Sequence, residues 1–493
     1  MATTSRSADL TSGPMLQKII LFSVPLAASS ILQLLFNAAD VVVVGRFAGS
    51  TALAAVGSNG ALINLLVNLF VGLSLGANVV AARCFGARDE KGVQDTVHTA
   101  VALGLVSGVL LAVVGFCAAR GLLELMSCPE DVISLSTLYL KIYFIGMPMT
   151  MLYNFSSALL RAMGDTKRPL YCLAAAGVIN VVLNLVFVIG FSMSVAGVAL
   201  ATIISQTVSA LLVTGMLVRE EGALRLDLRR LAFHAGTLKQ ILLIGLPAGL
   251  QSTVFSLSNV VIQSSINSFG SMVVAGNSAS SNLEGFVYTA MNAFAQAAVT
   301  FTSQNIGARK YHNLDRVIRN CLLCVVVTGL VLGGGAALAG HQLLRFYSSD
   351  TAVIATGAER LRLICGFYLL CGIMDVLASS LRGLGYSVLP MVVSLVGVCV
   401  LRLVWIATIF QLNRTPFYAV HQLPHQLGTD RTGASGLPAC GAAASAPEAA
   451  ADGINPFCIK AAPGRPKKSV RRCFYYITGP HPVPSSAQTP ARC

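Results

Sequence analysis

The chain has 493 residues, of which 55% are hydrophobic and only 11% are charged. Soluble domains carry about 25% charged residues, so this composition excludes a soluble globular protein and indicates an integral membrane protein. The net charge of +14 is typical of basic cytoplasmic loops and does not require a nucleic-acid partner. The 13 cysteines are scattered, without the spacing of a disulfide framework or a metal site.

The first apolar segment combines a proline near its start with an acid near its end. Gln33, Asn37 and Asp40 recur at helical spacing and share one face. An Asp at the centre of a spanning helix costs about 2.5–3.5 kcal/mol on insertion scales, so it normally faces a water-filled cavity or a partner. We interpret the stripe as a cavity wall with a proton- or cation-binding group. The plainer alternative is helix–helix hydrogen bonding around a neutral Asp40. Pro25 predicts a hinge.

Eleven segments are apolar and long enough to cross about 30 Å of hydrocarbon. If the N-terminus lies inside, the inner loops hold 16 Lys or Arg residues and the outer loops hold five. This excess predicts a cytoplasmic N-terminus, after a short tail over 1–15. The predicted spans are 16–44, 52–82, 95–118, 133–158, 169–190, 195–218, 239–266, 272–304, 317–340, 353–380 and 388–411.

The two halves of the chain repeat one another. Pro25 and Pro247 are 222 residues apart, and the sequence Gly-Ala-Arg at 86–88 recurs at 307–309, an offset of 221. One copy holds six spans, an even number, so both copies enter the membrane with the same orientation. We therefore predict an all-α membrane protein with two parallel six-helix lobes around a central cleft. The N-lobe is 16–218, a polar cytoplasmic loop covers 219–238, and the C-lobe is 239–411.

The repeat also predicts a twelfth span near 416–439, and the sequence there does not support one. The segment 412–493 is rich in Pro, Ala and Gly and carries nine Lys or Arg against three acids. That composition predicts a disordered basic tail. We hypothesise that a frameshift near Pro416 replaced the last span. An unbroken reading frame through the tail would refute this.

Further polar side chains lie at helical spacing on other predicted spans. A single buried amide is worth only about 0.6 kcal/mol as helix–helix glue, and for single residues that is the favoured interpretation. For the set on facing helices, with two more acids in the second lobe, we predict a polar cavity. The candidate residues are Asn154, Asn180, Asn184, Thr202, Gln206, Ser256, Asn259, Gln263, Glu284, Tyr288 and Asp375.

The sequence contains no ATP-binding motif, nucleophile elbow or metal cluster. We therefore expect a protein that is not an enzyme, has no cofactor and draws its energy from an ion gradient.

Several of these motifs together resemble the multidrug and toxic compound extrusion (MATE) family. The first span from Pro25 through Asn37-Ala38-Ala39-Asp40 to Gly45-Arg46 is similar to that family. So are the repeated Gly-Ala-Arg and the sequence Leu-Leu-Arg-Ala-Met-Gly-Asp at 159–165. The likeness covers residues 15 to about 411. It implies a twelve-helix fold of two lobes that exports organic, often cationic, compounds against an inward flow of H⁺ or Na⁺.

The resemblance also implies roles for first-lobe residues. Asp40 corresponds to the first-helix acid implicated in cation coupling, and Pro25 to the proline at the first-helix bend. Asn180, Asn184 and Thr202 fall where family members have their first-lobe polar site. Many members have an acid where this chain has Asn184.

In the second lobe, Asp375 matches a tenth-helix acid proposed for ion coupling. The seventh-helix Glu of some Na⁺-coupled members is absent, and Phe255 lies near that position. Glu284 on the eighth span is the candidate to replace it. H⁺ and Na⁺ both remain open as the coupling ion.

The leading interpretation is a secondary active exporter of small-molecule xenobiotics, monomeric, multi-pass and located in the plasma membrane. A lipid-linked oligosaccharide flippase of the same superfamily is an alternative, although more basic residues would be expected along its cavity. An inactive truncated transporter and a non-transporting scaffold are further alternatives. The expected partners are the substrate, H⁺ or Na⁺ and the lipid bilayer, without nucleic acid.

Overall fold

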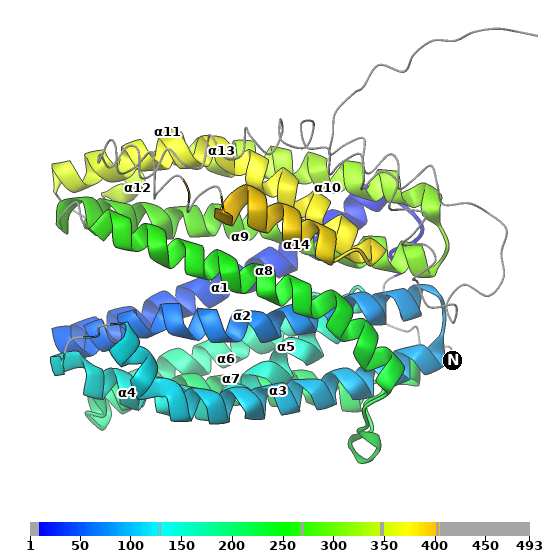
Figure 1. Ribbon diagram of the computed structural model, residues 1–493, viewed down its shortest axis with the longest axis horizontal. Coiled ribbons are helices and arrows are strands. Elements are labelled where there is room, and N and C mark those ends of the chain that lie inside the picture. The colour runs from blue at the N-terminus through cyan, green and yellow to red at the C-terminus, as the bar shows by residue number, and fades with distance from the viewer. Residues whose placement is uncertain are drawn as a thin grey trace, which may run out of the picture.

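The computed structural model describes residues 9–126, 128, 130–267, 271–345, 350–400 and 404. In these residues the chain is helical and arranged in two layers (Figure 1). The first layer contains α1 (Met15–Phe47), α2 (Ser50–Gly86), α3 (Glu90–Leu125), α4 (Glu130–Ile145), α5 (Met147–Ala162), α6 (Lys167–Leu185), the π-helix η1 (Val186–Gly190) and α7 (Ser194–Val218). The second contains α8 (Ala235–Asn267), α9 (Ser271–Gly307), α10 (Leu314–Thr328), η5 (Gly329–Gly333), α11 (Gly334–Leu338), α12 (Gly340–Leu344), α13 (Thr351–Leu384), α14 (Val388–Ser394) and η6 (Leu395–Val400). Short 3-10 turns lie at η2 (Gly222–Leu224), η3 (Leu228–Arg230) and η4 (Tyr311–Asn313).

Most of the predicted spans are present as long helices. Within the described ranges, seven helices are long and apolar enough to cross a membrane, and two bent pairs raise that number to nine. One bent pair is α4 with α5, broken by 48° at Gly146, and the other lies within α13, with a bend of 42°. The predicted span 272–304 falls in α9, a single helix of 37 residues whose many Ser, Asn and Gln side chains leave it outside that number.

The end of the chain is described only in part. The eleventh predicted span, 388–411, begins as α14 and η6, which reach Val400. The missing twelfth span, the tail over 412–493 and the proposed frameshift lie outside the described residues, so they stay predictions.

The internal repeat appears in the backbone as well as in the sequence. Arg88 and Arg309, 221 residues apart, adopt the left-handed conformation with φ of 57° and 58°, which is uncommon for a residue with a side chain. Gly164 and Gly385, again 221 apart, adopt φ of 85° and 99° just after α5 and α13. In both copies the glycine ends the helix in the left-handed conformation that costs glycine nothing.

Two helices cross from one layer to the other. The first half of α1 packs with the C-lobe, where Phe22 meets Phe301 of α9 edge-on at 5.6 Å between ring centroids. Its second half joins the N-lobe core through Val43 and Val44. Likewise α8 begins in the N-lobe core, with Ile241 buried there, and ends in the other layer. Pro25 lies inside α1 and Pro247 inside α8, so each crossing helix contains a residue that lacks a backbone donor.

The two lobes are packed tightly at the end of the molecule where α1 begins, which we call the closed end. A Cβ on Gly72 of α2 would stand 2.2 Å from the backbone nitrogen of Gly249 in α8. A Cβ on Gly86 would stand 2.0 Å from the carbonyl oxygen of Gln304. Toward the opposite end of α2, a Cβ on Gly57 would meet nothing within 4 Å. Only residues without side chains allow the backbones to approach this closely.

Candidate functional site

Asp40 lies in a cluster of uncharged polar groups inside the N-lobe. Its side chain is on α1 and only 8% exposed. Asn184 of α6 donates from Nδ2 to Asp40 Oδ1 at 2.5 Å and to Asn180 Oδ1 at 3.2 Å. Thr202 Oγ1 of α7 lies 3.4 Å from Asp40 Oδ2 and 2.9 Å from the carbonyl oxygen of Val198, and its single hydroxyl proton can be donated to either. The structure thus brings together Asp40, Asn180, Asn184 and Thr202, the four first-lobe residues to which the resemblance gives a role in ion coupling.

One oxygen atom of this cluster has no hydrogen-bond partner in the described part of the chain. The Asn184 side chain is fully buried, and its Oδ1 has no hydrogen-bond partner. Tyr139 and Tyr143 of α4 stack on one another at 5.9 Å and lie within electrostatic reach of Asp40. Among the described residues, no Lys, Arg or His forms an ion pair with Asp40. A buried carboxyl without a cationic partner favours binding of a proton or a metal cation.

Glu284 of α9 has a different environment. Its side chain is 4% exposed, and Arg360 Nη2 of α13 donates to its Oε2 at 3.0 Å. Tyr368 also donates to Oε2, at 3.2 Å, and Ser280 donates to Oε1 at 3.0 Å. Arg360 Nη1 donates to Ser281 Oγ at 2.6 Å. The C-lobe acid is therefore held in a buried ion pair with additional hydrogen bonds.

Asp375 of α13 lies in the same lobe and is half-buried. It is near the phenol of Tyr288 and in the field of Arg382, two helical turns further along α13. Arg382 donates from Nη2 to Gln251 Oε1 of α8 at 2.7 Å. The ring of Tyr288 lies 6.3 Å from that of Tyr368. The two C-lobe acids are thus linked through neighbouring tyrosines.

The remaining cavity candidates are spread over both lobes. Ser256 accepts a hydrogen bond from Asn68 of the N-lobe at 2.9 Å, so it joins α8 to α2. Asn154 donates to the carbonyl of Thr150 in its own helix, α5. Gln206 of α7 has a buried Oε1 without a partner. The other four candidates are Gln33 and Asn37, exposed on α1, Asn259, exposed on α8, and Gln263, whose side chain lies outside the described part of the chain.

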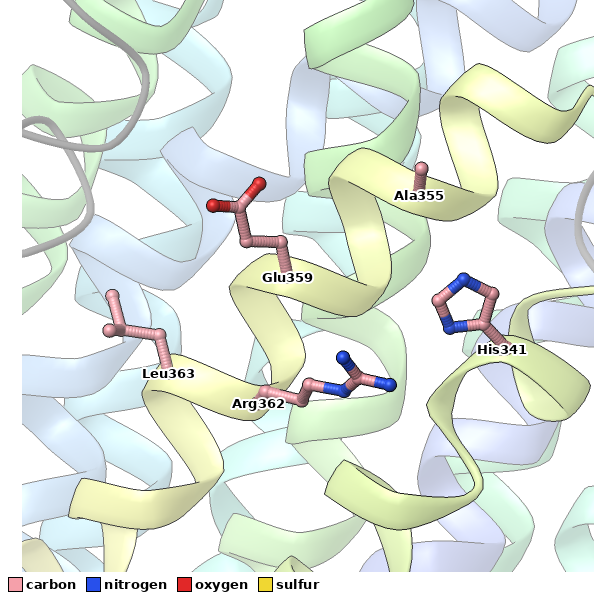
Figure 2. Close-up of a pocket in the computed structure, with 5 residues that line it drawn as sticks. All are labelled: His341, Ala355, Glu359, Arg362 and Leu363. Carbon is pink, nitrogen blue, oxygen red and sulfur yellow. The ribbon is translucent and has the colours of Figure 1, made fainter.

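One surface hollow lies between α12 and α13 of the C-lobe, and it involves none of the predicted residues. It is lined by His341 of α12 and by Ala355, Glu359, Arg362 and Leu363 of α13 (Figure 2). The α13 side chains share one helical face, which is not the face from which Arg360 reaches α9. Figure 2 shows the Arg362 guanidinium pointing toward the His341 ring. This hollow is therefore separate from the acid sites.

Sequence reasoning missed the partners of the acids. Arg360 falls within the predicted span 353–380, and the sequence did not indicate that it pairs with Glu284 of another helix. Its spacing gave no signal, because the two residues are 76 positions apart. Tyr139 and Tyr143 fall within the predicted span 133–158 and were not among the candidate residues. Their i, i+4 spacing facing an acid on another helix was the only available signal.

Comparison with known proteins gives a consistent result. The model of the MatE family matches residues 25–186 and again 247–408, so it finds the repeat in both halves. "Probable multidrug resistance protein YoeA" of Bacillus subtilis is 30% identical over 385 residues, which are 77% of this chain and 83% of that protein. "Multidrug export protein MepA" of Staphylococcus saprophyticus is 22% identical, over 74% of this chain and 80% of its own length.

Solved structures show the same fold. A MATE protein in a bent conformation superposes with a TM-score of 0.78 at 22% identity, covering 86% of this chain and 94% of that one. An outward-facing multidrug resistance transporter of the same family gives a TM-score of 0.78 at 23% identity, with the same coverage. At this level of identity the likeness concerns the arrangement of the helices.

Proposed function

Because the chain belongs to the MatE family, we propose that it is a secondary active multidrug exporter of the plasma membrane. It moves small organic compounds, often cationic, outward in exchange for H⁺ or Na⁺. The names of the relatives YoeA and MepA support multidrug export as the activity. The proposed protein is a monomer with its N-terminus in the cytoplasm, in accord with the excess of Lys and Arg in the loops on that side.

The observation that carries the proposal is the environment of Asp40. Among the residues that the structure describes, its carboxyl accepts hydrogen bonds from Asn184 and Thr202 only. In a low-dielectric site an ionised carboxylate without a cationic partner is costly, so it gains from taking up a proton or a cation. Na⁺, like other hard cations, takes oxygen ligands, and the unpartnered Oδ1 of Asn184 and the hydroxyl of Thr202 lie beside the carboxylate. The site thus suits either coupling ion.

Coupling to transport follows from the place of Asp40 on a crossing helix. Asp40 is 15 residues after Pro25, about 22 Å along the helix at 1.5 Å per residue. With the N-terminus inside, Asp40 lies toward the outer side. Neutralising its carboxylate changes its hydrogen bonds to α6 and α7, which biases the bend at Pro25. We propose that this change promotes release of substrate to the outside.

In the C-lobe, we propose that Asp375 contributes the second acid of the transport pathway. It lies near a tyrosine hydroxyl and has an arginine two turns away, which can hold its charge without a direct ion pair. Glu284 and the polar residues on α8 would line the same region. Tyr288, 40% exposed, is in reach of a cationic aromatic substrate, which aromatic rings attract.

The test is transport in vesicles reconstituted with the full chain. A fluorescent organic cation is followed under an imposed pH gradient, and separately under an imposed Na⁺ gradient. The parent chain is expected to accumulate the dye with one of the two, which identifies the coupling ion. Asp40→Asn is expected to lose gradient-driven accumulation in that condition.

The control for this experiment is Glu124→Gln, which removes an exposed acid paired with Arg120 at the end of α3. It is expected to transport like the parent chain. If Asp40→Asn drives the dye uphill as well as the parent does, Asp40 has only a structural role and the coupling mechanism is wrong. If the parent chain moves no organic cation with either gradient, the exporter itself is refuted.

A further inference from the structure

The segment before α1 is fixed to the C-lobe by buried contacts. Leu10 is only 2% exposed and packs in the same core cluster as Phe22 and Phe301. Its backbone N–H donates to Gln304 Oε1 at 3.2 Å, and its carbonyl accepts from Asn305 Nδ2 at 3.3 Å. Both of these partners are fully buried near the end of α9. The chain therefore enters α1 from a defined position on the C-lobe.

Thr11 extends this attachment to the turn after α9. Lys310 Nζ donates to Thr11 Oγ1 at 2.8 Å and to its carbonyl at 3.2 Å. Asn313 Nδ2 donates to the same carbonyl at 2.9 Å and to Asn305 Oδ1 at 3.0 Å. The segment thus contacts α9 and the following turn through Leu10 and Thr11.

Asp9 shapes the segment from within. Its carboxylate accepts from the backbone N–H and the hydroxyl of Thr11, at 2.8 and 2.7 Å, and from the hydroxyl of Ser12 at 2.6 Å. Burial opposes ionisation of Asp9, but these hydrogen bonds outweigh it and lower its pKa to about 2. The carboxylate is therefore charged at any working pH, and it holds the turn at Thr11 and Ser12.

Gln304 connects this segment to the other lobe. Its side chain is fully buried, and while Oε1 accepts from Leu10, Nε2 donates to the carbonyl of Ala162 at the end of α5 at 2.7 Å. One C-lobe side chain thus binds the segment before α1 and the N-lobe at once. In its neighbourhood Thr300 Oγ1 donates to Asn78 Oδ1 of α2 at 3.0 Å. The same end contains the close approach of Gly86 to the Gln304 backbone.

We propose that Gln304 and the segment Asp9–Pro14 form a latch that holds the two lobes together at the closed end. Gln304 acts as a positioning residue, because it sets the separation of α5 and α9 without contacting substrate. Opening this end requires the hydrogen bond to Ala162 to break. The latch has two proposed effects. Its control of substrate entry from this side rests on the proposed export function, whereas its control of lobe separation does not depend on that function.

The experiment is hydrogen–deuterium exchange with mass spectrometry on the full chain in lipid nanodiscs. Gln304→Met keeps the volume of the side chain and removes both hydrogen bonds. It is expected to speed exchange roughly tenfold around residues 72–78 of α2 and 241–249 of α8. These residues form the crossing between the lobes and do not touch Gln304, so a purely local defect would leave them unchanged. Gln17→Leu, an exposed change on α1, is the control and is expected to match the parent chain.

A second variant keeps the test decisive if Gln304→Met does not fold. Lys310→Met leaves Gln304 in place and removes the contacts of Lys310 to Thr11, so a smaller increase in the same two regions is expected. Unchanged exchange at 72–78 and 241–249 in both variants, or an increase confined to 9–13 and 301–313, would overturn the latch.

A transport measurement separates this inference from the proposed function. Where the parent chain transports, Gln304→Met is expected to lower the KM for substrate offered at the closed end several-fold, because the state that admits substrate is more populated. An unchanged or higher KM contradicts control of substrate entry by the latch. A parent chain without transport whose variants still show the expected exchange would refute the exporter and leave the latch standing.

Discussion

The two lobes share one architecture but surround their buried acids with different partners, neutral in one lobe and cationic in the other. In the N-lobe, Asp40 is surrounded by neutral donors, with Tyr139 nearby. In the C-lobe, Glu284 is paired with Arg360. The repeat offset of 221 aligns Tyr139 with Arg360. The same place in the two copies therefore holds an uncharged phenol in one lobe and a fixed cation in the other.

This difference indicates a division of roles. A buried carboxylate that already has a cationic partner gains little from a second cation, and its removal leaves the partner's charge uncompensated. A buried carboxylate with neutral partners must take up its counter-ion from solution. We therefore expect changes in the C-lobe pair to affect stability first, and changes in the N-lobe acid to affect coupling first.

The largest expected effect comes from breaking the C-lobe pair on one side only. Glu284→Met leaves Arg360 buried without its carboxylate, which typically costs about 3–5 kcal/mol. The double variant Glu284→Met with Arg360→Met removes both charges and is expected to recover most of that loss. Unfolding in detergent, followed for both single variants and the double, gives the coupling energy. Additive losses would show that the two side chains do not depend on one another.

The next effect tests the N-lobe side of the comparison. Asp40→Asn keeps the size of the side chain and removes its charge, so stability in the same unfolding assay is expected to change by less than about 1 kcal/mol. Gradient-driven accumulation is expected to fall by up to about 100-fold, since coupling energies of about 1–3 kcal/mol correspond to 5–150-fold. Loss of stability as large as that of Glu284→Met would erase the distinction between the lobes.

A third prediction concerns the helix crossings, where the copies also differ. The crossing of α2 and α8 uses Gly72 and Gly249, whereas the offsets of 221 and 222 place Ala293 and Ala27 at the corresponding positions of α9 and α1. Gly72→Ala would put a Cβ 2.2 Å from a backbone nitrogen, so we expect a loss of about 1–3 kcal/mol.

Gly57→Ala is the matched control for this prediction, because a Cβ there would meet nothing within 4 Å. Without a clash it is expected to leave stability unchanged or raise it slightly through helix propensity. Equal behaviour of the two alanine variants in thermal unfolding would mean that the α2–α8 crossing is less closely packed than described.

The smallest expected effect on the free energy of unfolding concerns the two segments that precede the crossing helices. Asp9 forms its turn before α1, and Asp227 accepts from the backbone N–H of Arg229 in the linker before α8. Asp9→Asn is expected to cost less than about 1 kcal/mol. Because the pKa of Asp9 is lowered from 3.8 to about 2, its contribution is present above pH 3.8 and is lost as the pH falls through 2.

Unfolding measured between pH 5 and 8 is therefore expected to show the same difference between Asp9→Asn and the parent chain at each pH. Asp227→Asn serves as the comparison on the N-lobe side. A difference for Asp9→Asn that grows or disappears within this range would contradict the assignment of a lowered pKa.

The sequence was sufficient for the features that depend on local pattern. The length of the apolar segments predicted the spans, and the paired motifs predicted the repeat. The family match and the matching left-handed conformations of Arg88 and Arg309 confirm the repeat. The cluster around Asp40 followed from the resemblance together with the i, i+4 spacing of Asn180 and Asn184. A helix face fixes which residues of one helix lie together, so these groupings need little tertiary information.

The features that were missed depend on contacts between distant helices. Arg360 lies well inside the predicted span 353–380 and inside α13, a helix of 34 residues, but a helical pattern within one span does not reveal a partner such as Glu284, which lies on another helix. The polar side chains of α9 are visible in the sequence, but the groups that they contact are not. Its buried Gln304 and Asn305 are satisfied by the segment before α1, some 295 residues earlier.

The exchange of half-helices between the lobes has a consequence for biosynthesis. Phe22 finds its edge-on partner only when Phe301 has been made, 279 residues later. At about 5–20 residues per second, the first half of α1 waits roughly 15 to 55 seconds in the bilayer before its native neighbour arrives. Neither lobe can complete its core alone, because the first half of α1 packs in the C-lobe and the first half of α8 packs in the N-lobe. The nascent N-lobe is therefore an intermediate with an open flank, and a ribosome that stalls between the lobes leaves a chain that cannot close.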